Sequence, residues 1–305
     1  MVLMMIEPNK LEIKVPNIFS WDEILVYLNR EPNEVMYKIN HKTLRRAFKL
    51  EEKIYLCDIS FNERKNVIEV TLLNDVHWSK IEQIVVINFI VEWFDLQTDI
   101  NPFYELAKED LILNPLMNKF YGLRLVGMPD FYEAITWGIL GQQINLQFAY
   151  TLKRRFTEKF GEKITYEEVD YWIYPEAKRI AETTIEDLLE LKLTLRKAEY
   201  LLDISKQIAN DDISKSYFLS FEDAKIIEKE MIKIRGIGPW TANYVLMRCF
   251  RKNEAFPMAD IGLLNGIKVI ENLSEKPDTT KMLALKEDWG EWASYAIFYI
   301  WRLLY

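Results

Sequence analysis

Two glycines one residue apart, followed by a proline, stand between two stretches with helical spacing and constrain how the chain must turn there. Residues 222–234 carry apolar side chains at helical intervals, and residues 239–251 are expected to form the next helix. Gly236 and Gly238 lack a Cβ, so the backbone can adopt a positive φ angle and approach another molecule closely. Pro239 suits the first position of a helix, where a missing N–H costs nothing. The sequence therefore predicts a helix, a tight hairpin and a second helix.

The hairpin is expected to present free backbone N–H groups at the positive end of the second helix, an arrangement that suits a phosphate. The stretch 233–252 contains no Asp or Glu, although the formal net charge of the whole chain is −8. Its basic residues are Lys233, Arg235, Arg248, Arg251 and Lys252. We therefore expect a local basic face on an acidic protein, while an ordinary interhelical turn remains the alternative for a Gly-x-Gly by itself.

Composition bounds the class of protein. The chain has 305 residues, 50% of them hydrophobic, which is enough for a large core and two or three domains. Its only cysteines, Cys57 and Cys249, are too few for a disulfide framework or a four-cysteine iron–sulfur cluster. His41 and His77 have no cysteine or carboxylate at ligand spacing, which argues against a catalytic zinc site. Both histidines are expected to be structural, and both thiols are expected to stay reduced.

The N-terminus does not resemble an export signal. Met1 to Ile6 is apolar but short, lacks a basic region and runs directly into Glu7. No apolar stretch approaches the length of a membrane span. We expect a cytoplasmic protein with no membrane partner.

The chain changes character along its length, which predicts an α+β fold. Residues 10–75 hold strand-like patches around one helix-like stretch, Trp21 to Leu28, and from Ser79 onward the apolar spacing is helical. We expect one long helical region from Phe131 to Phe156, broken at Gly141. The strand-like patches are Leu11 to Val15, Val35 to Ile39, Lys53 to Ile59 and Val67 to Leu73, and the later helical stretches are 185–193, 198–208 and the aromatic-rich 289–304.

The motifs together resemble a known family. The string from Ile234 to Tyr244 and the run from Phe256 to Asp260 are similar to the helix-hairpin-helix superfamily of base-excision DNA glycosylases, and within it to the DNA-3-methyladenine glycosylase II branch. The resemblance extends from about residue 90 to the C-terminus and is weaker before that. Further matching stretches are 94–97, 122–125, 139–143 and 292–296.

This resemblance implies an N-terminal antiparallel sheet with helices, followed by a mostly α-helical, two-lobed glycosylase domain. The boundaries that we expect are 1–104 for the N-terminal domain and 105–305 for the helical domain, with one lobe from 131–252 and the other from 105–130 plus 253–305.

Asp260 is the first candidate for catalysis. It precedes Ile261 and an apolar helical run, so it can cap that helix, and the helix N-terminus favours its ionised form. A carboxylate suits N-glycosidic cleavage, because the deoxyribose becomes positively charged as the base leaves. The resemblance implies the same catalytic role, against the alternative of a plain helix cap. Ile261 stands where better-known relatives carry an aromatic residue, so we expect a more open pocket rim.

Aromatic residues form the candidate base pocket. Trp240 and Tyr244 are spaced i, i+4 and share one helix face. A base that leaves the duplex needs a stacking partner, and a cationic alkylpurine would gain roughly 0.5–2 kcal/mol per good cation–π contact. The resemblance adds Trp292 and, through a weaker match, Tyr27 to this pocket, and it places Tyr295 in the core. The alternative is an ordinary aromatic core.

Trp240 also bears on the reaction type. In the bifunctional relatives, a lysine close after the Gly-x-Gly attacks the sugar through its amine. Gly238, Pro239 and Trp240 supply no amine at that place. We therefore expect hydrolysis by water, without strand cleavage.

Contacts with DNA are expected at the hairpin and at one further turn. Gly236, Gly238 and Thr241 are candidates for holding a phosphate, and Gln143 occupies the place of the family's intercalating side chain, where better-known relatives have leucine. The alternative for Gln143 is a solvated polar turn. The resemblance also implies that backbone carbonyls bind a monovalent cation, Na⁺ or K⁺, while no cofactor is required. These carbonyls belong to Ile232, Ile234 and Ile237.

The function that these expectations indicate is a monofunctional DNA glycosylase that flips alkylated purines out of duplex DNA in base excision repair. Damaged double-stranded DNA would be its partner, and we expect a monomer. Two alternatives remain open from the sequence: a glycosylase for oxidised or deaminated bases, and a noncatalytic helix-hairpin-helix DNA-binding protein.

Overall fold

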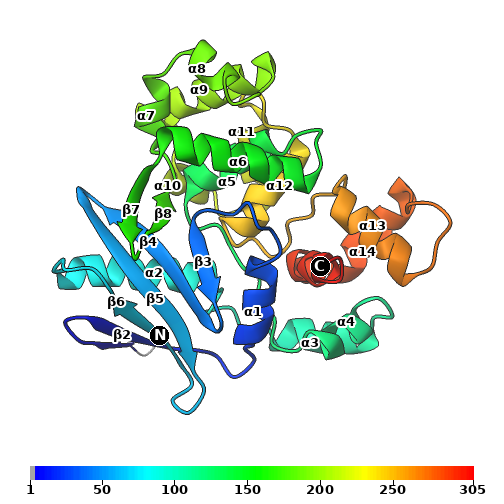
Figure 1. The fold of residues 1–305 in the computed structure, drawn as a ribbon. Helices are drawn as coiled ribbons and strands as arrows, with labels where there is room; N and C mark the ends of the chain where they lie inside the picture. Colours follow the sequence, from blue (N-terminus) through cyan, green and yellow to red (C-terminus); the bar gives the residue numbers. More distant parts are fainter. Residues whose placement is uncertain (1–3) are drawn as a thin grey trace.

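The computed structural model describes residues 4–305, and Met1 to Leu3, which begin the apolar N-terminal run, lie outside the described residues. A six-stranded antiparallel sheet forms the N-terminal part, with the strand order β1-β2-β6-β5-β4-β3 (Figure 1). Its strands are β1 (Met4–Ile6), β2 (Lys10–Lys14), β3 (Tyr37–Asn40), β4 (Thr43–Leu50), β5 (Lys53–Asn62) and β6 (Val67–Leu72).

Both faces of this sheet are covered. Phe48 of β4 packs edge-on against Phe89 of α2 (Lys80–Trp93), and Tyr55 of β5 stacks on Trp78 just before that helix. On the other face, Ala47 and Leu56 cluster with Tyr171 of a second, two-stranded sheet, β7 (Glu162–Tyr166) and β8 (Val169–Ile173). Side chains alternate between the faces of a strand, so neighbouring residues of β4 serve different cores.

The remainder is helical. Helix α1 (Trp21–Leu28) lies within the N-terminal part, and after α2 the described chain is helical apart from the β7–β8 hairpin between α6 (Leu146–Phe160) and α7 (Ala177–Ala181) (Figure 1). The other helices after α2 are α3 (Asn101–Glu109), α4 (Leu113–Lys119), α5 (Phe131–Leu140), α8 (Ile185–Leu189), α9 (Leu195–Ala209), α10 (Lys215–Leu219), α11 (Ala224–Ile232), α12 (Pro239–Arg248), α13 (Ile261–Ile270), α14 (Thr279–Trp289), the short 3₁₀ helix η1 (Gly290–Trp292) and α15 (Ala293–Arg302).

The helices form two groups, as Figure 1 shows. Helices α5 to α12 lie above the sheet, and α13, α14 and α15 lie beside α3 and α4. Tyr104 of α3 and Tyr299 of α15 share a hydrogen bond of 2.9 Å, which joins the second group. The expected domain boundary at residue 104 falls inside α3, so the helix that packs with α15 begins at residue 101.

The α+β fold class is confirmed, and so is the break of the long helical region: α5 ends at Leu140 and α6 begins at Leu146. Strand β4 and the hairpin β7–β8 had no counterpart in the sequence analysis. The last helix also begins later than residue 289, because Gly290, with a φ of 45°, separates α14 from α15. Among residues 4–305, no helix combines the length and the apolar character of a membrane span.

Candidate active site and nucleic-acid interface

The hairpin between α11 and α12 has the expected geometry. Gly236 has a φ of 92°, and a Cβ there would lie 2.4 Å from the ring of Tyr200, so both conformation and space require glycine. Gly238 is different: its φ is −97° and an added Cβ would meet nothing within 4 Å. Since Gly238 faces open space, its surroundings leave room for another molecule. Pro239 begins α12, as expected.

The turn between α5 and α6 is fastened to this hairpin. The Gln142 side-chain Nε2 donates to the Gly236 carbonyl oxygen at 2.8 Å. Gln143, the next residue, is exposed and has a φ of 56°, which places it at the tip of the turn. The sequence analysis singled out Gln143 and missed the role of Gln142. The wedge role of Gln143 stays a prediction.

The exposed basic side chains near the hairpin already have partners within the protein. Arg235 donates to Asp203 at 2.8 Å and also pairs with Glu199, and hydrogen bonds to these carboxylates raise the pKa of Arg235 above its ordinary value. Lys233 pairs with Glu230 at 2.6 Å, and Lys252 donates to the Glu222 carbonyl.

The two remaining arginines point inward rather than to the surface. Arg248 is 3% exposed, and Arg251 donates to the Leu125 carbonyl oxygen at 2.6 Å. The predicted basic face is therefore smaller than expected. Lys233 and Arg235 lie at the surface but are paired with carboxylates, whereas Arg248 and Arg251 point inward. The backbone N–H groups of the hairpin stay the predicted donors to a phosphate.

Two further predictions at the hairpin have less direct support. Thr241 is 2% exposed, and a Cβ at Gly138 would lie 2.4 Å from the Thr241 methyl carbon, so this side chain packs on α5 instead of facing solvent. The carbonyl of Ile234 accepts the Ile237 N–H at 3.0 Å. The cation site formed by the carbonyls of Ile232, Ile234 and Ile237 remains a prediction.

Asp260 is the N-cap of α13, and its carboxylate is held by three donors. Its Oδ1 accepts the Leu263 backbone N–H at 2.7 Å and the Trp301 indole N–H at 2.8 Å. Its Oδ2 accepts the Trp240 indole N–H at 3.0 Å. Asp260 is 8% exposed, while the adjoining Ile261 is 58% exposed, so the carboxylate lies just beneath the surface.

Gly262 makes room for this arrangement. A Cβ there would lie 3.0 Å from Asp260 Oδ1 and 3.1 Å from both Cδ1 and Nε1 of the Trp301 indole. One turn later, a Cβ at Gly266 would lie 2.2 Å from Ile300 Cγ2. The two glycines therefore let α13 approach α15 closely enough for Trp301 to reach Asp260.

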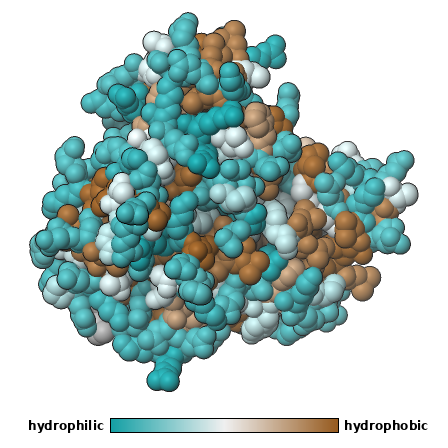
Figure 2. Space-filling model, in the orientation of Figure 1, coloured by the Kyte–Doolittle hydropathy of each residue, from teal (hydrophilic) through white to brown (hydrophobic). Residues whose placement is uncertain are grey.

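The aromatic pair predicted beside Asp260 is present. Trp240 and Tyr244 stack with ring centroids 5.3 Å apart and an interplanar angle of 23°. The ring of Tyr244 also lies 6.2 Å from that of Trp301. Figure 2 shows apolar residues gathered over the neighbouring region of α13 to α15, where Ile261 and Val269 are exposed.

Trp301 was missed, and Trp292 lies elsewhere. Trp292 packs against Phe103 and Tyr295, with ring centroids 6.2 and 5.8 Å away. It precedes α15 whereas Trp301 lies near its end, roughly 13 Å further along the helix at 1.5 Å per residue. The structure brings Trp301, not Trp292, to Asp260. The spacing of Gly262 and Gly266 was the available signal, since it indicates a close helix contact. Tyr295 is fully buried, as expected.

Tyr27 lies behind the aromatic pair. Its ring is 4.6 Å from Phe298 and only 1% of the residue is exposed. The guanidinium of Arg248 connects it to Tyr244, because the Arg248 carbon Cζ lies 5.5 Å from the Tyr27 ring and Nη1 donates to the Tyr244 hydroxyl at 3.1 Å. Its place in the base pocket stays a prediction.

Comparison with known proteins agrees with this geometry. Residues 136–291 match the profile described as "HhH-GPD superfamily base excision DNA repair protein", and residues 16–135 match "8-oxoguanine DNA glycosylase, N-terminal domain". The chain belongs to the HhH-GPD superfamily of base excision DNA repair proteins. A DNA-3-methyladenine glycosylase of Bacillus subtilis (strain 168) is 46% identical over 298 residues, 96% of each chain.

Solved structures share the HhH-GPD fold over nearly the whole chain. A 3-methyladenine DNA-glycosylase from Archaeoglobus fulgidus superposes with a TM-score of 0.78 at 22% identity, over 95% of this chain and 97% of that one. An 8-oxoguanine glycosylase/lyase of Clostridium acetobutylicum, in complex with double-stranded DNA, gives 0.75 at 18% identity, over 99% and 97%. At these identities the likeness establishes the fold alone. Because the superpositions cover nearly the whole chain, the N-terminal sheet and the helical part both belong to this shared fold.

Proposed function

We propose that this protein is a DNA glycosylase that extrudes alkylated purines from duplex DNA and hydrolyses their N-glycosidic bond. The 46% identity to a DNA-3-methyladenine glycosylase supports this substrate class. The observation that carries the proposal is the Asp260 carboxylate, held by the indole N–H groups of Trp240 and Trp301 beside a stacked aromatic pair.

The geometry suits stabilisation of a sugar cation. An ionised carboxylate has about four acceptor positions, and three are filled by Leu263, Trp240 and Trp301. The position left over is on Oδ2. A positively charged deoxyribose placed there would gain its interaction only as the base leaves, which lowers the barrier rather than strengthening substrate binding.

We propose hydrolysis without strand cleavage. An indole stands at position 240, directly after the Gly-Pro of the hairpin, and it donates to the catalytic carboxylate instead of supplying an amine. Incubation with lesion-bearing DNA and borohydride should therefore trap no covalent adduct, while alkali should still cleave the abasic product. A trapped adduct would refute this part of the proposal.

The deciding experiment compares the wild type with Asp260→Asn on duplexes that carry one lesion each. We expect excision by the wild type and its loss in the variant, with the affinity for duplex DNA retained. Binding by both proteins without excision of any lesion would instead indicate a noncatalytic DNA-binding protein. The panel holds 7-methylguanine, hypoxanthine and 8-oxoguanine, so that preference for a deaminated or oxidised base would replace the alkylpurine assignment.

A further inference from the structure

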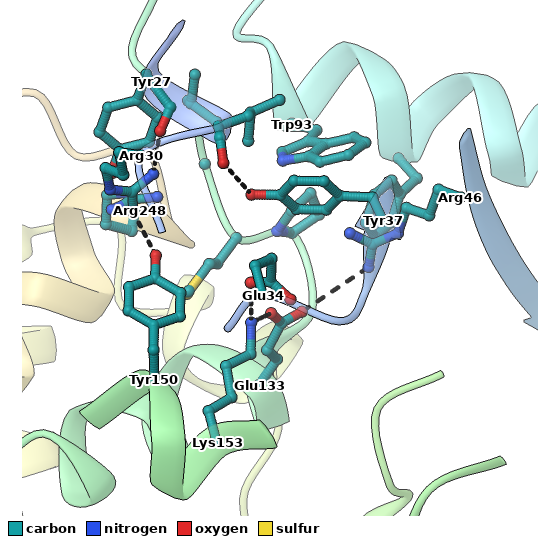
Figure 3. Close-up of a pocket in the computed structure, with 16 residues that line it drawn as sticks. Tyr27, Arg30, Glu34, Tyr37, Arg46, Trp93, Glu133, Tyr150, Lys153 and Arg248 are labelled. Carbon is teal, nitrogen blue, oxygen red and sulfur yellow. Dashed lines mark hydrogen bonds and ion pairs between the residues drawn. The ribbon is translucent and has the colours of Figure 1, made fainter. Parts of the chain in front are cut away.

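A cavity of about 30 Å³ lies where the N-terminal part of the chain meets α2, α5, α6 and α12 (Figure 3). Its walls include six ionisable side chains whose charges do not cancel. The two carboxylates and four basic groups are Glu34, Glu133, Arg30, Arg46, Lys153 and Arg248. With all six ionised, the lining carries an excess of two positive charges.

Lys153 forms ion pairs with both carboxylates. Its Nζ donates to Glu34 Oε2 and to Glu133 Oε1, each at 2.8 Å. Burial alone would lower the pKa of Lys153, but the charges of Glu133 and Glu34 raise it above its ordinary value. Burial would raise the pKa of Glu34, yet Lys153 lowers it. The Lys153 ammonium thus engages Glu34 Oε2 and Glu133 Oε1 and leaves little carboxylate surface for the arginines.

The three arginines are poorly compensated. Arg46 reaches Glu133 only at 3.9 Å, and its Cζ lies 4.7 and 4.8 Å from the ring centroids of Phe89 and Trp93. Within the described part of the chain, neither Arg30 nor Arg248 has a carboxylate oxygen within 4.0 Å.

Arg30 and Arg248 lie close to each other with neutral partners only. Arg30 donates to the hydroxyl of Tyr150 and to the carbonyl of Tyr27 (Figure 3). Arg248 donates to the hydroxyl of Tyr244. Both guanidinium groups face the Tyr27 ring, with Cζ atoms 3.7 and 5.5 Å from its centroid.

Each of the three arginines also keeps its Nε–H donor unused. In the described residues, the Nε atoms of Arg30, Arg46 and Arg248 are buried and have no hydrogen-bond partner. Arg46 is 7% exposed and Arg248 is 3% exposed, so solvent does not compensate them. Buried unpaired charges are costly, which favours an anion that lies among these groups. Asp130 does not supply it, because its carboxylate caps α5 and lies outside the lining.

We propose that this cavity binds one small inorganic monoanion, chloride under ordinary conditions, which joins the N-terminal part of the chain to the helices that carry the site. The size fits: a buried water needs roughly 10–15 Å³ of such space, so the cavity takes about two water-sized particles. A monatomic anion fits this space with one water, whereas phosphate and larger anions do not.

The test uses thermal unfolding of the free protein at constant ionic strength while sodium chloride replaces sodium gluconate, whose anion is too large to enter. A ligand that binds only the folded state raises the unfolding temperature as its concentration passes the dissociation constant. We expect a saturable rise of several degrees with chloride for the wild type. An equal unfolding temperature in both salts would overturn the proposal.

Arg46→Gln removes one positive charge from the cavity and should abolish most of the chloride-dependent rise. The matched control is Arg154→Gln on α6, an exposed arginine paired with Glu158, which should keep the full rise. Each variant is compared with itself in the two salts, so a general loss of stability does not obscure the result. An undiminished rise in Arg46→Gln would count against the site.

A direct measurement covers the case in which Arg46→Gln fails to fold. Crystals of the wild type grown with sodium bromide should show an anomalous scattering peak within hydrogen-bonding distance of Arg46 and Arg248. Water alone in the cavity would overturn the proposal. Neither measurement involves DNA or excision, so this inference can fail while the proposed glycosylase function stands, and the reverse.

Discussion

Replacing Trp301 by phenylalanine tests which tryptophan supports Asp260: Trp301, as in the structure, or Trp292, as expected from the sequence. Phe keeps a ring at the end of α15 but removes the indole N–H that donates to Asp260 Oδ1 at 2.8 Å. A hydrogen bond to a charged group contributes about 1.5–3 kcal/mol, and each 1.4 kcal/mol corresponds to roughly a factor of ten. Oδ1 retains the Leu263 N–H, so we expect the lower part of this range, about a 10- to 30-fold loss.

The assay is the single-turnover rate of excision from a duplex with one 7-methylguanine, with enzyme in excess. The matched change is Trp292→Phe, nine residues earlier, whose ring packs on Phe103 and Tyr295. That variant should lose stability by about 1 kcal/mol while its excision rate stays within about twofold of the wild type. A larger loss of rate in Trp292→Phe than in Trp301→Phe would refute the assignment of Trp301 to Asp260.

Three other contacts lead to further expected outcomes. Gly262→Ala should lower the excision rate at least tenfold with little loss of DNA affinity, because the added methyl displaces the Asp260 carboxylate or the Trp301 indole, as rate and binding measurements would show. Glu199→Gln should strengthen binding to undamaged duplex and steepen its salt dependence by less than about one unit, as a fluorescence titration at several salt concentrations would measure, since it removes one of the two carboxylates that engage Arg235 and leaves only Asp203. Burial raises the pKa of Cys249 to about 12 and the pKa of Cys57 well above its ordinary value, so at pH 8 a thiol reagent should modify both far more slowly in the native protein than in denaturant.

Each of these outcomes has its own control. The fold of Gly262→Ala should match the wild type by circular dichroism, and normal excision by a folded variant would contradict the packing argument. For Glu199→Gln the control is Glu186→Gln, an exposed glutamate on α8, and equal affinity changes in the two would mean that net charge alone acts. Rapid labelling of the native thiols would show that Cys57 and Cys249 are not buried as described.

The parts of the site that the sequence predicted correctly are those set by neighbouring residues. A Gly-x-Gly-Pro turn defines its own backbone, and an aspartate before an apolar run caps the helix after it. Gly236 and Asp260 could therefore be placed from local chemistry. The stacking of Trp240 on Tyr244 results in the same way from their i, i+4 spacing.

The features that the sequence did not reveal depend on contacts between distant segments. The carboxylates that pair with Arg235 lie on α9, more than thirty residues away, so the sequence around Arg235 gave no sign that this side chain is paired. Strand β4 alternates poorly because both of its faces are buried, against α2 and against β7–β8. Trp301 and Trp292 stand on one aromatic-rich segment, and only the packing of α13 on α15 decides which of them reaches the carboxylate.

The Asp260 carboxylate accepts hydrogen bonds from α12, which lies in the upper group of helices, and from α15, which lies in the other. The orientation of the carboxylate therefore depends on the contact between the two groups of helices. A disturbance that slides them apart by even one ångström would misalign the acid while leaving every helix intact. For the proposed reaction, heat or mild denaturant would then lower the excision rate before it lowers the helical circular dichroism signal. The excision rate would be the more sensitive measure of whether this interface is intact.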